Sequence, residues 1–219
     1  MKNIIALLLV AVMALSMAAC GTTTPAETTG TTAAVETTVD TTPAETTEDT
    51  TPVETTEGTT VAAENAASKV LNTIWALYTE DTKFFAMGGD YNAPVDGAAG
   101  VVDVTATDFL TFSLIVPETE VANIAEAASL LHAMNANTFT GGAYVLAEGA
   151  DQAAFVAAMQ TAIQGNQWMC GFPETLLIAK CDGVIVVAFG NGEVMTTFNT
   201  NLTAAYAEAE ILVNEAIGG

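Results

Sequence analysis

The chain has 219 residues and a formal net charge of −22, with 26 acidic residues against four lysines and no arginine. Such a surface repels phosphate backbones and anionic lipid head groups, which argues against nucleic acid as a partner. Solubility and mutual repulsion at a crowded surface explain the acidity, and a charge-specific partner is the alternative.

The first twenty residues have the pattern of a secretory signal. Lys2 precedes an apolar run of about a dozen residues, and small residues then lead to Cys20. This run is shorter than the ~20 residues that a transmembrane helix needs. The segment Ser16–Cys20 resembles the lipobox of bacterial lipoproteins, although Met17 stands where leucine is commoner. A plain signal peptide ending near Ala19 is the alternative. We predict a signal peptide over residues 1–19 and lipid on Cys20 that anchors the protein to the extracytoplasmic face of the membrane.

Residues 20–65 differ sharply in composition from the rest of the chain. After Cys20 they are mostly threonine, alanine, glutamate and proline, with no aromatic or basic residue. Glu-Thr-Thr recurs every nine residues, at Glu27, Glu36, Glu45 and Glu54. A stacked β-helix could have such a period, but only isolated Ala and Val are available for its inner face. The segment is therefore predicted to be a disordered spacer.

Residues 66–219 are expected to form one globular domain, and its first half reads as mainly helical. Apolar residues at helical spacing predict a helix over 63–79. A Gly- and Pro-rich stretch from Lys83 to Gly100 reads as an irregular loop, and a short helix is expected over 107–116. Pro117 then starts a further helix that continues to Met134. Its expected buried face consists of Val121, Ile124, Ala128, Leu131 and Met134.

The second half predicts strands and helices in alternation. A strand is expected over 139–147, with a bulge at Gly141-Gly142, and a helix capped by Asp151 is expected to end at Gly165. Asp182-Gly183 predicts a tight hairpin between strands 175–181 and 184–189. Asn191 is expected to cap a last long helix, and residues 210–217 read as a strand or a helical tail. The order β-α-β-β-α-β predicts an α+β domain with a ferredoxin-like antiparallel sheet, both helices on one face, and the N-terminal helices alongside.

Three local strings carry a resemblance to a known family: residues 83–90 (KFFAMGGD), 132–140 (HAMNANTFT) and 167–173 (QWMCGFP). With the hairpin and the last helix, they are similar to a domain of unknown function found in lipoproteins of Gram-positive anaerobic bacteria. The resemblance spans roughly residues 84–206. It implies a surface lipoprotein and supplies no activity or catalytic residue.

A cysteine–histidine pair is the sharpest enzymatic hypothesis. His132 is the single histidine, expected near a helix end, and Cys170 would be the nucleophile with Asn135 or Asn137 orienting the imidazole. The structural alternative is that His132 interacts with the end of the helix while the two asparagines turn the chain. Cys170 and Cys181 are expected as two thiols, because six extended residues span ~20 Å; a disulfide would need the intervening segment to fold back.

Other candidate sites are weaker. Oxygen ligands for calcium crowd one glycine-rich loop (Asp90, Asn92, Asp96, Asp103), but an EF-hand would need glycine where Val95 stands. Three aromatic side chains are either core or a carbohydrate-stacking platform (Tyr144, Trp168, Phe172). No metal or cofactor is expected, since one His and two Cys cannot complete a closed zinc site.

These observations favour a membrane-anchored, non-enzymatic binding or interaction module at the cell surface. Its ligand would be a cell-wall component, a protein or a small molecule, held near His132, Asn135, Asn137, Trp168 and Cys170. The alternative is a thiol-dependent hydrolase or transferase that uses Cys170.

Overall fold

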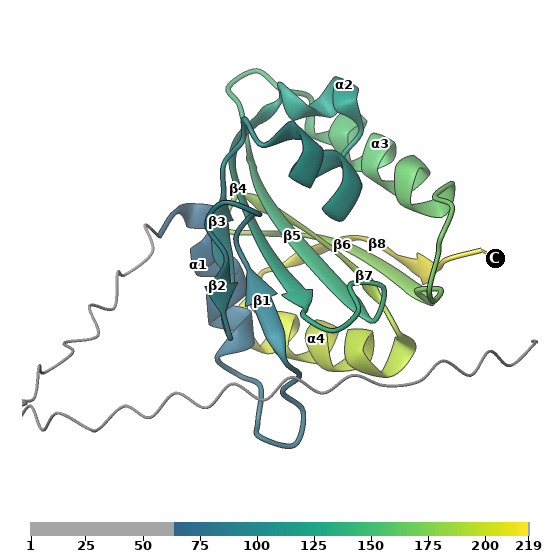
Figure 1. The fold of residues 1–219 in the computed structure, drawn as a ribbon. Coiled ribbons are helices and arrows are strands. Elements are labelled where there is room, and N and C mark those ends of the chain that lie inside the picture. Colours follow the sequence, from purple (N-terminus) through teal and green to yellow (C-terminus); the bar gives the residue numbers. More distant parts are fainter. Residues whose placement is uncertain (1–63, 219) are drawn as a thin grey trace, which may run out of the picture. The chain divides into compact units, whose positions relative to one another are not determined.

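A computed structural model describes residues 64–218 of the chain. The predicted signal peptide, the lipid anchor at Cys20 and nearly all of the predicted spacer lie outside the described residues. Within the described range, no helix is both long and apolar enough to span a bilayer. The domain is α+β, as predicted, with an antiparallel sheet of eight strands between two layers of helices (Figure 1).

The described residues form five helical segments and eight strands. The helical segments are α1 (Ala66–Trp75), the π-helical turn η1 (Phe109–Ser113), α2 (Glu118–Val121), α3 (Gln152–Gln164) and α4 (Gly192–Ala205). The strands are β1 (Ala86–Gly88), β2 (Val95–Asp96), β3 (Gly100–Val102), β4 (Ile124–His132), β5 (Phe139–Leu146), β6 (Thr175–Cys181), β7 (Val184–Gly190) and β8 (Glu210–Ala216). The sheet order is β2-β1-β4-β5-β7-β6-β8, and β3 also pairs with β4.

The ferredoxin-like arrangement with both helices on one face is wrong in two respects. In that topology β8 would pair with β5, but β4 occupies this edge of β5 and β8 pairs with β6 instead. The two crossovers, β5-α3-β6 and β7-α4-β8, therefore both run toward the β8 edge of the sheet. They start from β5 and β7, which are antiparallel to each other. Because such crossovers are almost always right-handed, α3 and α4 must cover opposite faces. Figure 1 shows α3 and α4 on opposite sides of the sheet.

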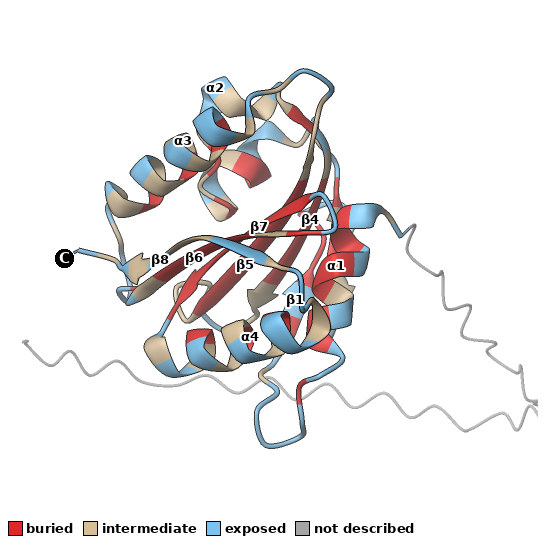
Figure 2. Ribbon diagram, turned by 180° about the vertical axis from the view of Figure 1, so that it is seen from behind, coloured by how far each residue is buried: buried red, intermediate tan, exposed pale blue. Residues whose placement is uncertain are grey.

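The two faces of the sheet carry separate cores. One core packs α1 and α4 against alternate residues of the strands, including Ala143, Leu177 and Val186. The other packs η1 and α3 against the residues between them, including Tyr144, Ile178 and Ile185. Figure 2 shows the buried strands in the middle and exposed residues on the outer sides of the helices. All seven residues of β7 are buried, because a central strand covered on both faces has no solvent side.

The predicted helix over 117–134 is largely a strand. Only Glu118–Val121 is helical, and Ile124–His132 forms β4, paired with β5 on one edge and with β1 and β3 on the other. Ala128 and Leu130 enter the α1 core, while Ala127 enters the α3 core. A strand buried on both faces does not alternate in polarity, so helical spacing matched it by chance.

The predicted irregular loop over 83–100 contains β1 and β2, and β3 begins at its end. The chain leaves the edge of β4 after Gly88 and returns at Gly100, so that β1 and β3 pair with successive parts of the same strand. The two ends of this excursion touch: a Cβ atom on Gly88 would lie 2.2 Å from the Gly100 nitrogen. Ser129 Oγ donates to the Gly89 carbonyl at 2.6 Å and fixes the exit point.

Several local predictions are confirmed. Asp182 and Gly183 have φ of 49° and 81° in the β6–β7 turn, as a tight hairpin requires. Asp151 accepts the Ala153 and Ala154 amides and caps α3. The last segment is a strand, β8, rather than a helical tail.

Two details differ from the predictions. The Asn191 side chain makes no capping hydrogen bond, and the first amide of α4 donates to Glu174 Oε2 at 3.0 Å instead. Gly141 and Gly142 pair in regular register with both β4 and β7, so they form no bulge. Gly142 instead leaves room for the Tyr144 ring, since a Cβ atom there would lie 2.3 Å from the tyrosine hydroxyl.

Candidate binding groove

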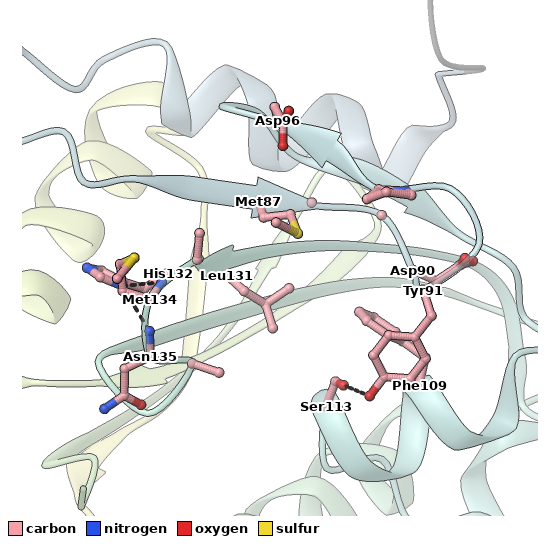
Figure 3. Close-up of a pocket in the computed structure, with 15 residues that line it drawn as sticks. Met87, Asp90, Tyr91, Asp96, Phe109, Ser113, Leu131, His132, Met134 and Asn135 are labelled. Atoms are coloured by element: carbon pink, nitrogen blue, oxygen red, sulfur yellow. Dashed lines mark hydrogen bonds between the residues drawn. The ribbon is translucent and has the colours of Figure 1, made fainter. Parts of the chain in front are cut away.

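Two adjoining cavities open along η1 on the α3 side of the sheet, and they share Ser113 and Ala136. We call them the apolar cavity, of about 490 Å³, and the polar cavity, of about 390 Å³, and together the groove. The apolar cavity is bounded by the β1–β2 hairpin, η1 and the end of β4 (Figure 3). The polar cavity lies between η1, the β4–β5 connection and the segment that follows α3.

Exposed hydrophobic side chains concentrate at this groove. The described part of the chain has nine large hydrophobic residues that are exposed, and five of them line the two cavities: Met87, Tyr91, Phe112, Met134 and Met169. Exposed apolar side chains scattered singly are normal, whereas contiguous exposed apolar patches are typical of interaction sites and ligand-binding grooves. Flexible methionines adapt to the shape of a ligand, and the groove has three of them.

The wall of the apolar cavity on the η1 side is aromatic. The Tyr91 and Phe109 rings meet edge to face with their centroids 4.9 Å apart. The Tyr91 hydroxyl and Ser113 Oγ form a hydrogen bond of 2.7 Å, which fixes the exposed tyrosine against η1. Figure 3 shows Met87 and Leu131 on the side of the cavity across from these rings, with Met87 above Leu131 in this view. The wall is therefore preorganised, and Met87 provides an adaptable edge.

The polar cavity combines an aromatic side chain with neutral hydrogen-bonding groups. Trp168 packs on Phe189 with ring centroids 5.2 Å apart, so it is partly core, and its buried Nε1 has no hydrogen-bond partner among the described residues. Hydroxyl and amide groups supply the polar lining (Thr111, Ser113, Asn137, Thr140, Asn166, Gln167). Ile115 also lines this cavity with φ of 56°, a conformation that costs a β-branched residue about 1–2 kcal/mol.

Two of the predicted site residues act as a clamp. Asn137 Nδ2 donates to the carbonyls of Met169 at 2.7 Å and Gly171 at 3.1 Å. Asn135 Nδ2 donates to the Cys170 carbonyl at 3.0 Å. Three successive carbonyls of the loop after α3 are thus held by the β4–β5 connection. This clamp fixes the end of the polar cavity that carries Met169.

His132 ends strand β4 rather than a helix, so its predicted position was wrong. Its Nδ1 accepts the Met134 and Asn135 amides, both at 3.3 Å, which requires the neutral ring with the proton on Nε2. The ring stacks on Phe84 at 5.3 Å, against the α1 core. His132 is therefore a capping residue that shapes the β4–β5 connection. The structural alternative placed this interaction at the end of a helix, and the structure has the end of a strand there instead.

Within residues 64–218, Cys170 and Cys181 are the two cysteines, and both are free thiols. Cys170 is exposed with φ of 63°, and it lines neither cavity. Cys181 lies at the other end of β6 and is buried, and burial together with the nearby Asp182 carboxylate raises its thiol pKa to about 11. The structure brings Cys170 and His132 to the same connection through Asn135, but among the described residues no hydrogen bond joins the two.

The four oxygen donors considered for calcium do not gather. The buried Asp90 carboxylate accepts the amides of Asn92, Ala93 and Asp103 at 2.8, 3.1 and 2.9 Å, and so holds the β1–β3 excursion together. Asp103 accepts hydrogen bonds from Thr105, which lower the pKa of its carboxyl. Between residues 64 and 218, no group of three acidic, histidine or cysteine side chains is placed to hold a metal ion.

The three predicted aromatic residues separate. Tyr144 is fully buried against Phe155 in the α3 core, with burial raising its pKa, so it belongs to no platform. Phe172 is 69% exposed beside the clamped loop. Trp168 lines the polar cavity from a partly buried position.

The main groove residues were missed by sequence reasoning. Met87, Tyr91 and Phe109 lay in segments read as a loop and a short helix, and Met134 was assigned to a helix face. A signal did exist, because residues 83–90, 132–140 and 167–173 are the strings that carry the family resemblance. Each of the three contributes residues to the groove.

Comparisons with protein-family models, with curated proteins and with solved structures find no match to this chain.

Few ionisable side chains line the groove. Its lining includes three ionisable side chains other than tyrosine: Asp90, Asp96 and His132. Asp90 and His132 are occupied by backbone amides, and Asp96 is exposed on β2. The rest of the lining offers apolar contact and neutral hydrogen-bonding groups, and Asp96 is its exposed carboxylate.

Proposed function

We propose that this protein is a lipid-anchored extracytoplasmic binding module that displays its folded domain on a spacer and holds a ligand in the groove. The observation that carries the proposal is the clustering of exposed methionine and aromatic side chains around two adjoining cavities. Cavities of 300–1,000 Å³ lined by apolar and aromatic groups, with a few polar ones, are typical of ligand sites.

The cellular part of the proposal rests on the N-terminal sequence and on the resemblance to lipoproteins. Replacing Cys20 with alanine removes the thiol that would carry the lipid. The protein is then expected to leave the membrane fraction or to remain as an unprocessed precursor. A native Cys20 found without lipid by mass spectrometry contradicts this part.

The binding part is tested by filling the groove. Ala136 lines both cavities at their junction, so Ala136→Phe places a ring where the ligand would lie. Ala204→Phe is the matched control, because it adds the same ring at an exposed position of α4. We expect a thermal-shift screen against peptidoglycan fragments, glycans, peptides and small amphiphiles to find ligands that stabilise the parent and the control but not Ala136→Phe. Ligands that stabilise all three proteins equally would place binding elsewhere.

A thiol-dependent hydrolase or transferase has less support. Cys170 lines neither cavity, and Nδ1 of His132 is occupied by two amides. Covalent turnover of a substrate that is lost in Cys170→Ser would favour this alternative over binding.

A further inference from the structure

Among residues 64–218, the charged side chains that line the groove are both negative. Asp90 and Asp96 line the apolar cavity, and none of Lys69, Lys83 and Lys180 lines either cavity. Lys83 pairs with Glu80 at 3.7 Å instead. Between residues 64 and 218, these three lysines face 18 acidic residues, so no nearby cation offsets the two aspartates.

The negative potential coincides with surfaces that bind cations without an ion pair. Tyr91 and Phe109 form an aromatic wall, and aromatic faces attract ammonium groups within about 6 Å. Met87 and Met134 add polarisable thioethers next to it. The carboxylate oxygens of Asp90 accept hydrogen bonds from three backbone amides. Asp96 is therefore the carboxylate that is available for direct contact with a ligand.

The size of the cavity favours a small molecule over a protein partner. The apolar cavity has a volume of about 490 Å³, which is within the range of small-ligand sites. A stable protein–protein interface buries about 800 Å² on each partner and needs a broad surface. A hollow of this volume fits one compact ligand with an apolar body.

We propose that the apolar cavity binds a small amphiphilic cation: a protonated or quaternary amine whose apolar body packs on Met87 and Leu131 and whose positive end lies near Tyr91, Phe109 and Asp96. This inference rests on the proposed binding function and specifies its ligand class. An anionic ligand of the same shape is repelled by the two aspartates, and a neutral one gains only the apolar contacts.

The test compares three probes with one tail: octyltrimethylammonium, octyl sulfate and octanol, each below the concentration at which it aggregates. Isothermal titration is expected to give the tightest binding for the ammonium probe and the weakest for the sulfate. Asp96→Asn should weaken the ammonium probe by about two- to fivefold, the range of an exposed ion pair, and leave octanol unchanged. Tyr91→Leu should weaken the ammonium probe by a similar factor, through loss of the aromatic face.

Glu148→Gln is the matched control for general attraction to an acidic protein. It removes one negative charge from an exposed residue after the far end of β5, and it should leave ammonium binding unchanged. If Glu148→Gln weakens the ammonium probe as much as Asp96→Asn, or if octyl sulfate binds as tightly, the charge-selective site is refuted.

Different results would overturn the groove as a ligand site and the preference of its apolar cavity for small cations. Equal binding of all three probes that Ala136→Phe abolishes leaves the groove as a ligand site and overturns the inference about charge. Binding of a basic peptide but not of octyltrimethylammonium also overturns the small-ligand inference and keeps the groove. Binding of the probes that Ala136→Phe does not affect refutes both.

Discussion

Removing the Asn137 amide tests whether the clamp shapes the polar cavity. In Asn137→Ala the carbonyls of Met169 and Gly171 lose donors at 2.7 and 3.1 Å. A net hydrogen bond contributes about 0.5–1.5 kcal/mol, and these bonds are near the surface, so the loop should lose about 1–2 kcal/mol. The φ of 63° at Cys170 costs about 1 kcal/mol, which the clamp has to offset. The loop should therefore detach locally before the sheet unfolds.

Two measurements separate local from global loss. Limited proteolysis of the purified protein should cut the substituted variant between Trp168 and Glu174, where the parent resists. The free energy of global unfolding, measured with urea, should fall by less than the local stability of the loop, because the sheet can stay folded when the loop detaches. Asn137→Asp should be worse than Asn137→Ala, since a carboxylate cannot donate to the two carbonyls and repels them.

Coupling to Asn135 gives a further check. Asn135 holds the Cys170 carbonyl of the same loop, so adding Asn135→Ala to Asn137→Ala should cost less than Asn135→Ala alone. Asn92→Ala is the control, because Asn92 is exposed and no hydrogen bond of its side chain is found within residues 64–218. A variant Asn137→Ala with the proteolysis and stability of Asn92→Ala would refute the clamp.

Three further predictions concern the thiols and the core. Iodoacetamide should label the exposed Cys170 in the native protein and the buried Cys181 only after unfolding; rapid native labelling of both would contradict the burial of Cys181. The pKa of Cys181 is raised to about 11, so its contribution to stability is complete below the unfolded value of about 9. As pH rises from 9 to 11 the protein should lose up to about 2–3 kcal/mol, measured by urea unfolding, and Cys181→Ala should lose less over the same interval. Gly142→Ala should destabilise by about 1–3 kcal/mol, because its Cβ would lie 2.3 Å from the hydroxyl of the buried Tyr144; unchanged thermal stability would show that the ring can move.

The sequence alone predicted the elements that local chemistry determines. The Asp182-Gly183 turn needs two positive φ angles, and few residue pairs other than Asp-Gly and Asn-Gly accept them, so the β6–β7 hairpin was readable. Asp151 and Gly165 marked the two ends of α3. The first amides of a helix need acceptors, which Asp151 supplies, and the last carbonyls need donors, which include the Gly165 amide.

Tertiary structure selected the secondary structure of segments whose hydrophobic pattern fits both a helix and a strand. Residues 124–132 could be one face of a helix or a strand buried on both sides, and the pairing of β4 with β1, β3 and β5 selects the strand. That choice then excludes β8 from the edge of β5, moves it beside β6, and places α4 opposite α3. One long-range pairing thus changed both the strand order and the layers.

The groove depended on the same kind of information. The sequence marked Asn135, Asn137 and Trp168, but it could not show that the two asparagines clamp the loop after α3. Met87, Tyr91 and Met134 become a site only when β1 and η1 are set against the end of β4. Local composition determines turns and caps because their partners lie a few residues away, whereas a groove is built from segments dozens of residues apart, and only the folded sheet brings them together.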